Sequence, residues 1–340
     1  LLKVKNTFSL DKFSLILWVK PDTLKIVKES RHIFRFFFRL KEHLSNKIEK
    51  NLPYPHQAIL SALILGERQK LPSLIKDSFM RTGTVHILSI SGLHVGMMVY
   101  IFYLFLKLLR FPRQISLFLL ILFIIPYVIL TGAKAPIVRA GIMSGVYLSG
   151  LILRREGNIL NSLAIACWLI LIFDPYQLFN AGFQLSFLGV LSIVLFTPLI
   201  ENYFLREKEE RVIFKKAHIK RYLFRLFAVS LSAWLGSSGL IGYYFKIINP
   251  IAILANIIVI PLSFFVLATG IIFLFSFSLF TSPLSTTNLL TIEILLKSVT
   301  FLSKIPGGTV SVTNFSFPLV ILYYLCLGII TLVIKVRRKR

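Results

Sequence analysis

Residues 84–109 read TVHILSISGLHVGMMVYIFYLFLKLL, a stretch that is apolar enough to cross a bilayer but polar in its first half. A helix needs about 20 predominantly apolar residues to span the hydrocarbon. The polar positions of the first half are His86, Ser89, Ser91, Gly92, His94 and Gly96. Polar groups inside a bilayer are costly unless they face protein or water. The stretch therefore predicts a membrane helix whose first turns face the interior of a helical bundle.

The composition of the whole chain agrees with a membrane protein. Of its 340 residues, 56% are hydrophobic and 14% are aromatic, which is more than a single water-soluble core needs. The chain has 39 basic and 14 acidic residues and a formal net charge of +25. Such an excess favours a negatively charged partner, either nucleic acid or anionic lipid. We therefore expect an all-α, polytopic transmembrane bundle, with the choice of partner still open.

Composition divides the chain into four regions. Residues 1–23 contain the alternating apolar run FSLILWVK before Pro21, which predicts a strand. Residues 24–84 form an amphipathic region, and a basic, phenylalanine-rich helix at 24–50 is expected in the membrane interface. A soluble helix packed on a neighbour is the alternative for 24–50. Residues 85–334 form the polytopic part, and residues 335–340 form a basic tail.

Hydropathy predicts six strong membrane spans followed by a more broken region. The spans lie at about 85–109, 115–131, 136–153, 159–173, 182–200 and 223–245. Residues 249–280 contain Pro250 and Pro261, which predict a kinked or re-entrant segment. Residues 287–304 are a weaker amphipathic candidate, and 317–334 form the last clear span.

The distribution of lysine and arginine predicts the orientation, because short basic loops stay in the cytoplasm. Basic residues follow the first, third and fifth spans, at Lys107, Arg110, Arg113, Arg154, Arg155 and in the segment 206–221. The alternate loops hold only Lys134, Arg139 and Lys246. Residues 1–84 are therefore expected outside the cytoplasm. The basic tail would be cytoplasmic only if residues 249–316 cross the membrane an even number of times, which the sequence leaves open.

Four membrane regions contribute polar groups that we expect to face a shared path. The main candidates, one from each region, are His94, Arg139, Gln184 with its neighbour Ser186, and Asn256. The first three have structural alternatives. The first span would make a close helix crossing through the GxxxG at Gly92 and Gly96, Arg139 would snorkel to the interface, and Gln184 would form an interhelical hydrogen bond. Asn256, between two prolines, is expected in irregular backbone that lines a cavity enclosed by protein.

The Ser91 and His94 pair, at helical i, i+3 spacing, also suggests nucleophilic catalysis. However, no Asp or Glu lies in the same run to orient the imidazole. His86 and His94 lack a third zinc ligand of suitable type nearby. We therefore expect no catalytic residue, no metal site and no cofactor.

Taken together, five stretches resemble a known family. They are GERQ (66–69), HILSISGLHVG (86–96), PIVRAGIM (136–143), DPYQLFNAGFQLSF (174–187) and NPIAILANIIVIPL (249–262). In this order they are similar to the competence domain of the ComEC family of DNA-uptake channel proteins. The resemblance covers roughly residues 50–310.

The resemblance implies a multi-pass protein of the bacterial inner (plasma) membrane that passes single-stranded DNA into the cytoplasm during natural transformation. The implied partners are single-stranded DNA, membrane lipids and other proteins of the competence machinery, with a homo-oligomer as an open alternative. Family members often carry an OB-like domain before this region, so residues 1–23 are expected to be its remnant. Many carry a metallo-β-lactamase-like domain after it, but this sequence has no HxHxDH-type metal motif. We therefore assign no nuclease activity.

Two other classes of function stay open. The first is a membrane-embedded enzyme that uses His86, Ser91 and His94. The second is a transporter of small solutes, for which an inverted repeat of broken helices is expected. Residues 249–280, which two prolines interrupt, have no matching partner segment in the first half of the chain, and this disfavours the transporter.

Overall fold

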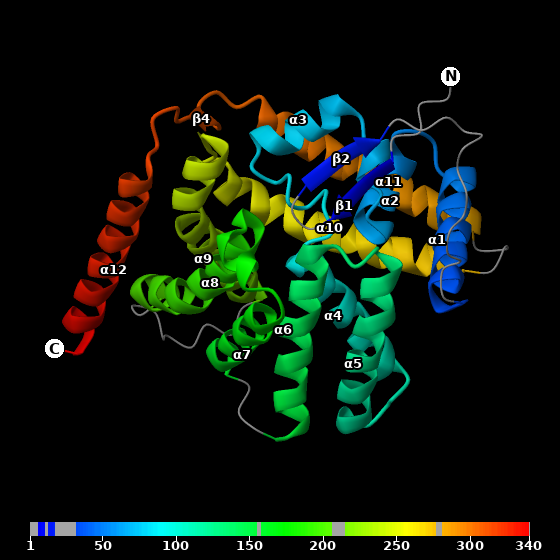
Figure 1. Cartoon of the computed structure of the whole chain (residues 1–340), viewed down its shortest axis with the longest axis horizontal. Coiled ribbons are helices and arrows are strands. Elements are labelled where there is room, and N and C mark those ends of the chain that lie inside the picture. Colours follow the sequence, from blue (N-terminus) through cyan, green and yellow to red (C-terminus); the bar gives the residue numbers. More distant parts are fainter. Residues whose placement is uncertain are drawn as a thin grey trace.

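The computed structural model describes residues 6–10, 13–17, 32–154, 158–205, 215–276 and 281–339. Helices dominate these ranges, which confirms the all-α class (Figure 1). At the amino-terminal end, β1 (Asn6–Leu10) pairs antiparallel with β2 (Phe13–Leu17). The strand predicted before Pro21 is therefore confirmed over its first five residues. The assignment of residues 1–23 to an OB-like remnant stays a prediction.

Three helices precede the first span. They are α1 (His32–Asn51), α2 (His56–Leu65) and α3 (Ser73–Arg81), with the short 3-10 helix η2 (Arg68–Lys70) between the last two. The amphipathic helix predicted at 24–50 is confirmed from His32 onward, and residues 24–31 lie outside the described ranges. Its Leu44 and Ile48 are buried, whereas Phe36 and Phe38 are exposed. The apolar helix α2 lies at the centre of the main hydrophobic core.

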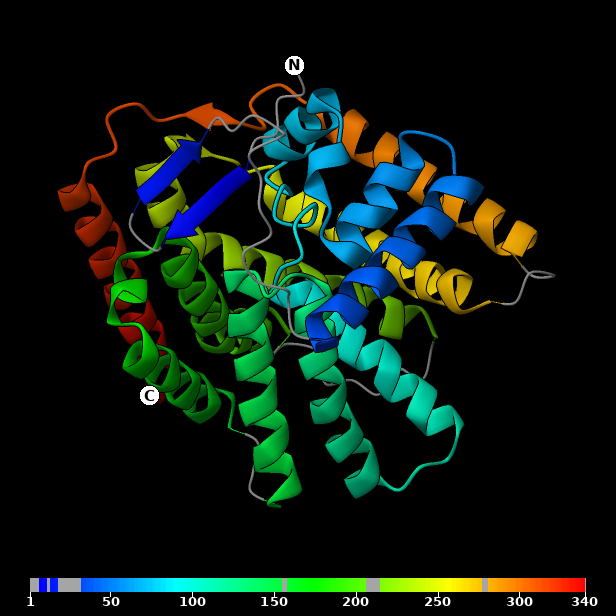
Figure 2. The ribbon, with the colours of Figure 1, turned by 45° about the vertical axis from the view of Figure 1, so that its right-hand side comes forward.

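Six further helices match the six predicted spans. They are α4 (Gly92–Leu108), α5 (Arg113–Leu130), α6 (Ala135–Ile152), α7 (Ile159–Phe173), α8 (Ala181–Leu205) and α9 (Lys215–Phe245). The loop from α4 to α5 and the carboxyl end of α6 lie at the lower end in both views (Figures 1 and 2). The 3-10 helix η3 (Pro175–Phe179) precedes α8.

The start of the first span was predicted too early. The helix begins at Gly92, and residues 84–91 form turns and bends. The Ser89 hydroxyl donates to the His86 carbonyl, and Gly83 has a left-handed φ of +69°. Serine side chains that bond to nearby backbone groups compete with helix formation. His86 and Ser89 therefore do not share a helical arc with His94.

The proline-containing segment forms one continuous helix, α10 (Ala252–Phe275), and its predicted kinked or re-entrant path stays a prediction. Pro250 lies before the first turn, and Pro261 inside the helix removes only one backbone donor. The helix pairs with α11 (Thr281–Ser303), and this hairpin runs across the molecule above α5 and α6 (Figures 1 and 2). The last helix is α12 (Phe317–Lys339).

The chain enters and leaves the α10–α11 hairpin at the same end of the molecule. β3 (Ile247–Ile248), just before the hairpin, pairs antiparallel with β4 (Val310–Ser311), just after it. In addition, the Ile251 amide donates to the Gly308 carbonyl. Residues 249–316 therefore begin and end on the same side of the molecule, and α12 begins at the end where α9 finishes. This return favours an even number of crossings, which stays a prediction.

Candidate functional site

The helices α4, α6 and α8 start close together at one end of the bundle. A Cβ added at Gly92 would lie 3.5 Å from the Cβ of Ala140, which places the start of α4 against α6. Arg139 lies one turn after the start of α6, and its Nη2 donates to the Ser186 hydroxyl of α8 at 3.2 Å. We call Ser91, His94, Arg139 and Ser186 the helix-start cluster. Because helix N-termini carry partial positive charge, this end of the bundle favours anions.

Arg139 is the charged member of the cluster. Its side chain is only 4% exposed, and its Nε has no hydrogen-bond partner. Gly182 leaves room for the guanidinium, because a Cβ there would lie 3.2 Å from Nη2. Among the described residues, no carboxylate forms an ion pair with Arg139. The arginine does not snorkel to the interface, and its buried charge is only partly satisfied by the protein.

His94 is fully buried and has one free ring nitrogen. Its Nδ1 lies 3.1 Å from the Ser91 hydroxyl, which confirms the predicted i, i+3 pair, while Nε2 has no partner. A Cβ added at Gly66 would lie 3.1 Å from the Cδ1 of Ile90, so the turn before the 3-10 helix η2 lies against the loop before α4. Among the described residues, no carboxylate forms a hydrogen bond with this imidazole that would orient it.

Gln184 uses both of its amide atoms within the protein. Its Nε2 donates to the Leu178 carbonyl, and its Oε1 accepts from the Tyr244 hydroxyl, each at 2.9 Å. It thereby ties η3 and α9 to the start of α8. These bonds favour the interhelical role that the sequence left as an alternative, and the path-lining role of Gln184 stays a prediction.

Asn256 lies in a different contact, between α9 and α10. Its Nδ2 lies 3.2 Å from the Ser230 hydroxyl, which itself donates to the Ile253 carbonyl. Its Oδ1 is buried without a partner. The structure therefore pairs Ser91 with His94 at the start of α4 and Arg139 with Ser186 between α6 and α8, and Asn256 takes part in neither contact.

The remaining predicted positions lie at the edge of the cluster. His86 contacts the Gly83 carbonyl through Nδ1 at 3.2 Å, outside any helix. A Cβ at Gly96 would meet nothing within 4 Å, so this residue is not part of a helix crossing. Of the GxxxG pair, only Gly92 contacts another helix.

A second set of cations beside the cluster was not predicted as a site. The Nζ of Lys134, just before α6, donates to the Gly66 carbonyl at 2.6 Å. Burial, together with the charges of Lys41 and Arg68, lowers the pKa of Lys134. We call Lys41, Arg68 and Lys134 the outer cations. Gly66 is the sequence feature that could have indicated this site, because glycine often ends a helix before a charged loop. In the structure it ends α2 with a left-handed φ of +76°.

Glu67 is an acidic residue that lies among these cations, and its carboxylate contacts two lysines. Its carboxylate lies 2.9 Å from Lys70 and 3.8 Å from Lys41, and it accepts a hydrogen bond from Ser45. Lys70 also pairs with Glu49 of α1. The local balance of charge beside the helix-start cluster therefore stays positive. Within the described ranges, no three His, Cys, Asp or Glu side chains are placed to hold a metal ion.

The described helices α5, α6, α8, α9 and α10 are long and apolar enough to cross a membrane. Together with the buried polar cluster at one end of the bundle, they define a polytopic integral membrane protein. The chain belongs to the Competence protein family, which it matches over residues 63–337.

The chain is similar to several proteins from bacteria. It is 32% identical over 232 residues to ComE operon protein 3 of Bacillus subtilis (strain 168), covering 68% of this chain and 28% of that protein. It is 26% identical over 224 residues to Recombination protein 2 of Haemophilus influenzae, covering 64% and 28%. An uncharacterized Aquifex aeolicus protein is 27% identical over 253 residues, covering 74% and 55%. The chain thus spans from about a quarter to about half of these relatives' lengths. No solved structure matches.

Proposed function

We propose that this chain forms the membrane part of a channel that passes single-stranded DNA through the bacterial inner membrane during natural transformation. The observation that carries the proposal is the buried Arg139, which has a free Nε and no ion pair with any described residue. A buried cation without an anion is costly. A passing phosphodiester would supply the missing anion at the point where three helix N-termini meet.

The arrangement around Arg139 suits a polyanion that must enter and then leave. The outer cations Lys41, Arg68 and Lys134 would capture the strand by releasing its counterions. Deeper in, the helix-start cluster offers one guanidinium, one imidazole and hydroxyl groups. This lower density of charge would keep the strand from binding too tightly to move on. Membership of the Competence protein family and the relative named Recombination protein 2 support a role in DNA uptake.

Replacing Arg139 tests the proposal. Arg139→Gln should reduce the transfer of labelled DNA into the cytosol at least about tenfold, because a charged hydrogen-bonding group is worth roughly 1.5–3 kcal/mol. The matched control is Arg113→Gln, which removes an exposed arginine at the start of α5. Transfer would be measured as nuclease-resistant label in a strain that carries the variant in place of its own gene. Normal transfer in Arg139→Gln cells with wild-type protein levels would reject the role of Arg139.

The contact between Ser91 and His94 is the observation that favours the alternative of a membrane-embedded enzyme. Their 3.1 Å separation suits a nucleophile and its base, although a third, orienting group is missing from the contact. If the pair is structural, Ser91→Ala should change DNA transfer by only a few fold, since it removes one hydrogen bond. Loss of transfer in Ser91→Ala cells as complete as in a deletion strain would favour catalysis instead.

A further inference from the structure

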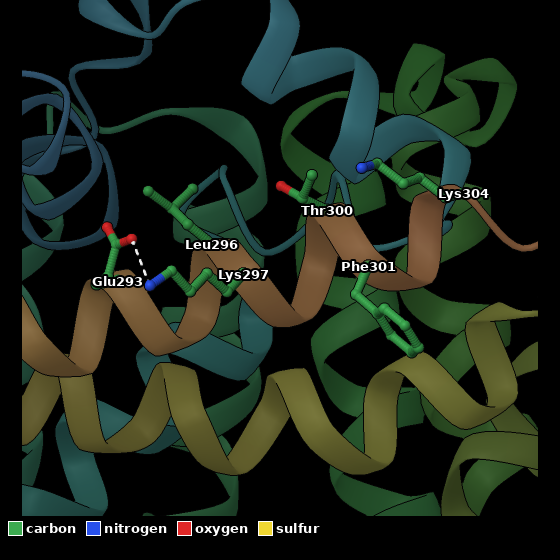
Figure 3. A pocket seen from close by; sticks show the side chains of 6 residues that line it. All are labelled: Glu293, Leu296, Lys297, Thr300, Phe301 and Lys304. Carbon is green, nitrogen blue, oxygen red and sulfur yellow. Dashed lines mark ion pairs between the residues drawn. The ribbon is translucent and has the colours of Figure 1, made fainter.

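The outward face of α11 carries a groove that is separate from the helix-start cluster (Figure 3). Its volume is about 340 Å³, and it is lined by Glu293, Leu296, Lys297, Thr300, Phe301 and Lys304. The opposite face of α11, which includes Ile292, Leu295 and Val299, is buried in the main core. The groove therefore lies on a face of α11 other than the one buried in the core, with His56 of α2 beside its Glu293 end.

Apolar side chains are exposed on both helices of this hairpin. On α11 they are Leu290, Ile294 and Phe301, which are 56%, 52% and 70% exposed. On α10, Leu254, Ile258, Phe265 and Ile272 are exposed as well. Water-soluble proteins rarely expose such a large continuous apolar surface. In an integral membrane protein, lipid would cover an exposed apolar surface of this kind and would therefore surround the groove.

The groove itself carries a net positive charge. Lys304 directly follows the last residue of α11. Its ammonium group forms no hydrogen bond or ion pair with any described residue. Lys297 lies 3.3 Å from Glu293, and its side chain is 77% exposed (Figure 3). The Glu293 carboxylate is also 2.9 Å from His56 Nε2, so a second group shares its charge. The groove thus offers one free ammonium and a second that is held only by a shared carboxylate.

We propose that this groove binds an anionic phospholipid, with the headgroup phosphate between Lys297 and Lys304. These residues are seven positions apart, which places them about 10 Å apart along the helix, and Thr300 lies between them with a hydroxyl that donates to phosphate. Phe301, which is 70% exposed, contacts an acyl chain. An exposed aromatic group between two lysines fits a lipid, whose acyl chain it covers, and nucleic acid is the other occupant that the test distinguishes.

The position of the groove along the bundle agrees with a headgroup. Lys304 lies near the segment in which Gly308 bonds to Ile251 and β4 pairs with β3. This segment closes the hairpin at the end where α9 finishes, and the lipid phosphates lie at the ends of membrane-spanning helices.

The test compares two lipid headgroups on the full chain reconstituted in bilayer nanodiscs. Spin-labelled phosphatidylglycerol and phosphatidylcholine report the fraction of each lipid held at the protein surface. Lys297→Gln and Lys304→Gln should each reduce the preference for phosphatidylglycerol about fivefold at most, the value of one lysine near an anionic surface. Glu293→Gln should raise the preference, because it frees Lys297. The matched control is Lys107→Gln, an exposed lysine in the last turn of α4, and should leave it unchanged.

The opposite effects of Glu293→Gln and the lysine variants separate lipid binding from damage to the fold, which would lower the preference in all three. An equal preference in the wild type and in the double variant Lys297→Gln/Lys304→Gln overturns the proposal. A second result would also overturn the proposal. If the double variant no longer binds a single-stranded oligonucleotide but keeps its lipid preference, the groove binds nucleic acid instead. None of these results bears on Arg139 or on the proposed channel.

Discussion

Arg139 and His94 are buried polar side chains that each keep one nitrogen free of any protein partner. Gln184, by contrast, has both amide atoms bonded to other elements. Buried polar groups are normally satisfied, and the exceptions often mark functional positions. At the residue scale, this difference separates groups that are available to a ligand from groups that hold the helices together.

The carboxylate of Glu49 predicts a contribution to stability that depends on pH. Its hydrogen bond with Lys70 holds the pKa of Glu49 below its ordinary value of 4.5. The stabilisation is therefore complete above about pH 4.5 and is lost as the pH falls through the folded-state pKa. Glu49→Gln should lower the thermal midpoint at about pH 7 by only one or two degrees, because the pair is partly exposed.

The difference between the wild type and Glu49→Gln should shrink as the pH falls below about 4.5 and disappear below the folded-state pKa of Glu49. Thermal unfolding of both proteins in the same detergent, measured across this range, checks the prediction. The matched control is Glu42→Gln, an exposed position on the same helix. A difference that stays constant down to about pH 3 would mean that the pair with Lys70 is not its source.

At the scale of elements, α12 is held on α9 through one close crossing. The hydroxyls of Tyr323 and Tyr324 donate to the carbonyls of Leu235 and Gly236 at 2.7 Å and 2.8 Å. Gly239 makes this approach sterically permissible, because a Cβ there would lie 2.8 Å from a ring carbon of Tyr323. The rest of α12 exposes most of its apolar side chains, including Leu322, Leu325 and Ile329.

Gly239→Ala should destabilise this crossing by about 1–3 kcal/mol, the usual cost of an added methyl group in a tight contact. Gly145→Ala on α6 is the matched control, since a Cβ there meets nothing within 4 Å. The control should be neutral or stabilising by up to about 1 kcal/mol, because alanine is the better helix former. Thermal unfolding in detergent measures both. Equal stability of the two variants would contradict the tight crossing.

At the scale of the whole molecule, the pairing of β3 with β4 decides the direction of α12. Because the α10–α11 hairpin returns to the end where it began, α12 runs from that end toward the level of the basic loops. Both views show the carboxyl end well below β4 (Figures 1 and 2). This direction agrees with the excess of basic residues in the last positions of the chain and in the loop that follows α4.

Cysteine labelling tests this topology. In a chain without Cys167 and Cys326, Thr313→Cys beside β4 should react with a membrane-impermeant maleimide in intact cells. Gln114→Cys, at the start of α5, should react only after the cells are made permeable. Both positions are exposed, so their reactivity reports the side of the membrane. The reverse pattern would contradict the orientation, and equal labelling of both would contradict the even number of crossings.

The sequence by itself determined the class of fold, the positions of the spans and the Ser91 and His94 pair. All three depend on hydropathy or on helical spacing, which act between residues that are near one another in the chain. The start of α4 was misplaced, because local bonds of serine side chains outweighed the apolar pattern.

Only the tertiary structure decided which polar groups meet. Arg139 contacts Ser186, 47 positions away, and Lys134 contacts Gly66, 68 positions away, whereas Asn256 packs against α9 instead of joining them. β3 and β4 are also far apart in the sequence, and their pairing determines the direction in which α12 runs. Such contacts depend on how the helices pack together, and the hydropathy of a single segment contains no information about its neighbours in space.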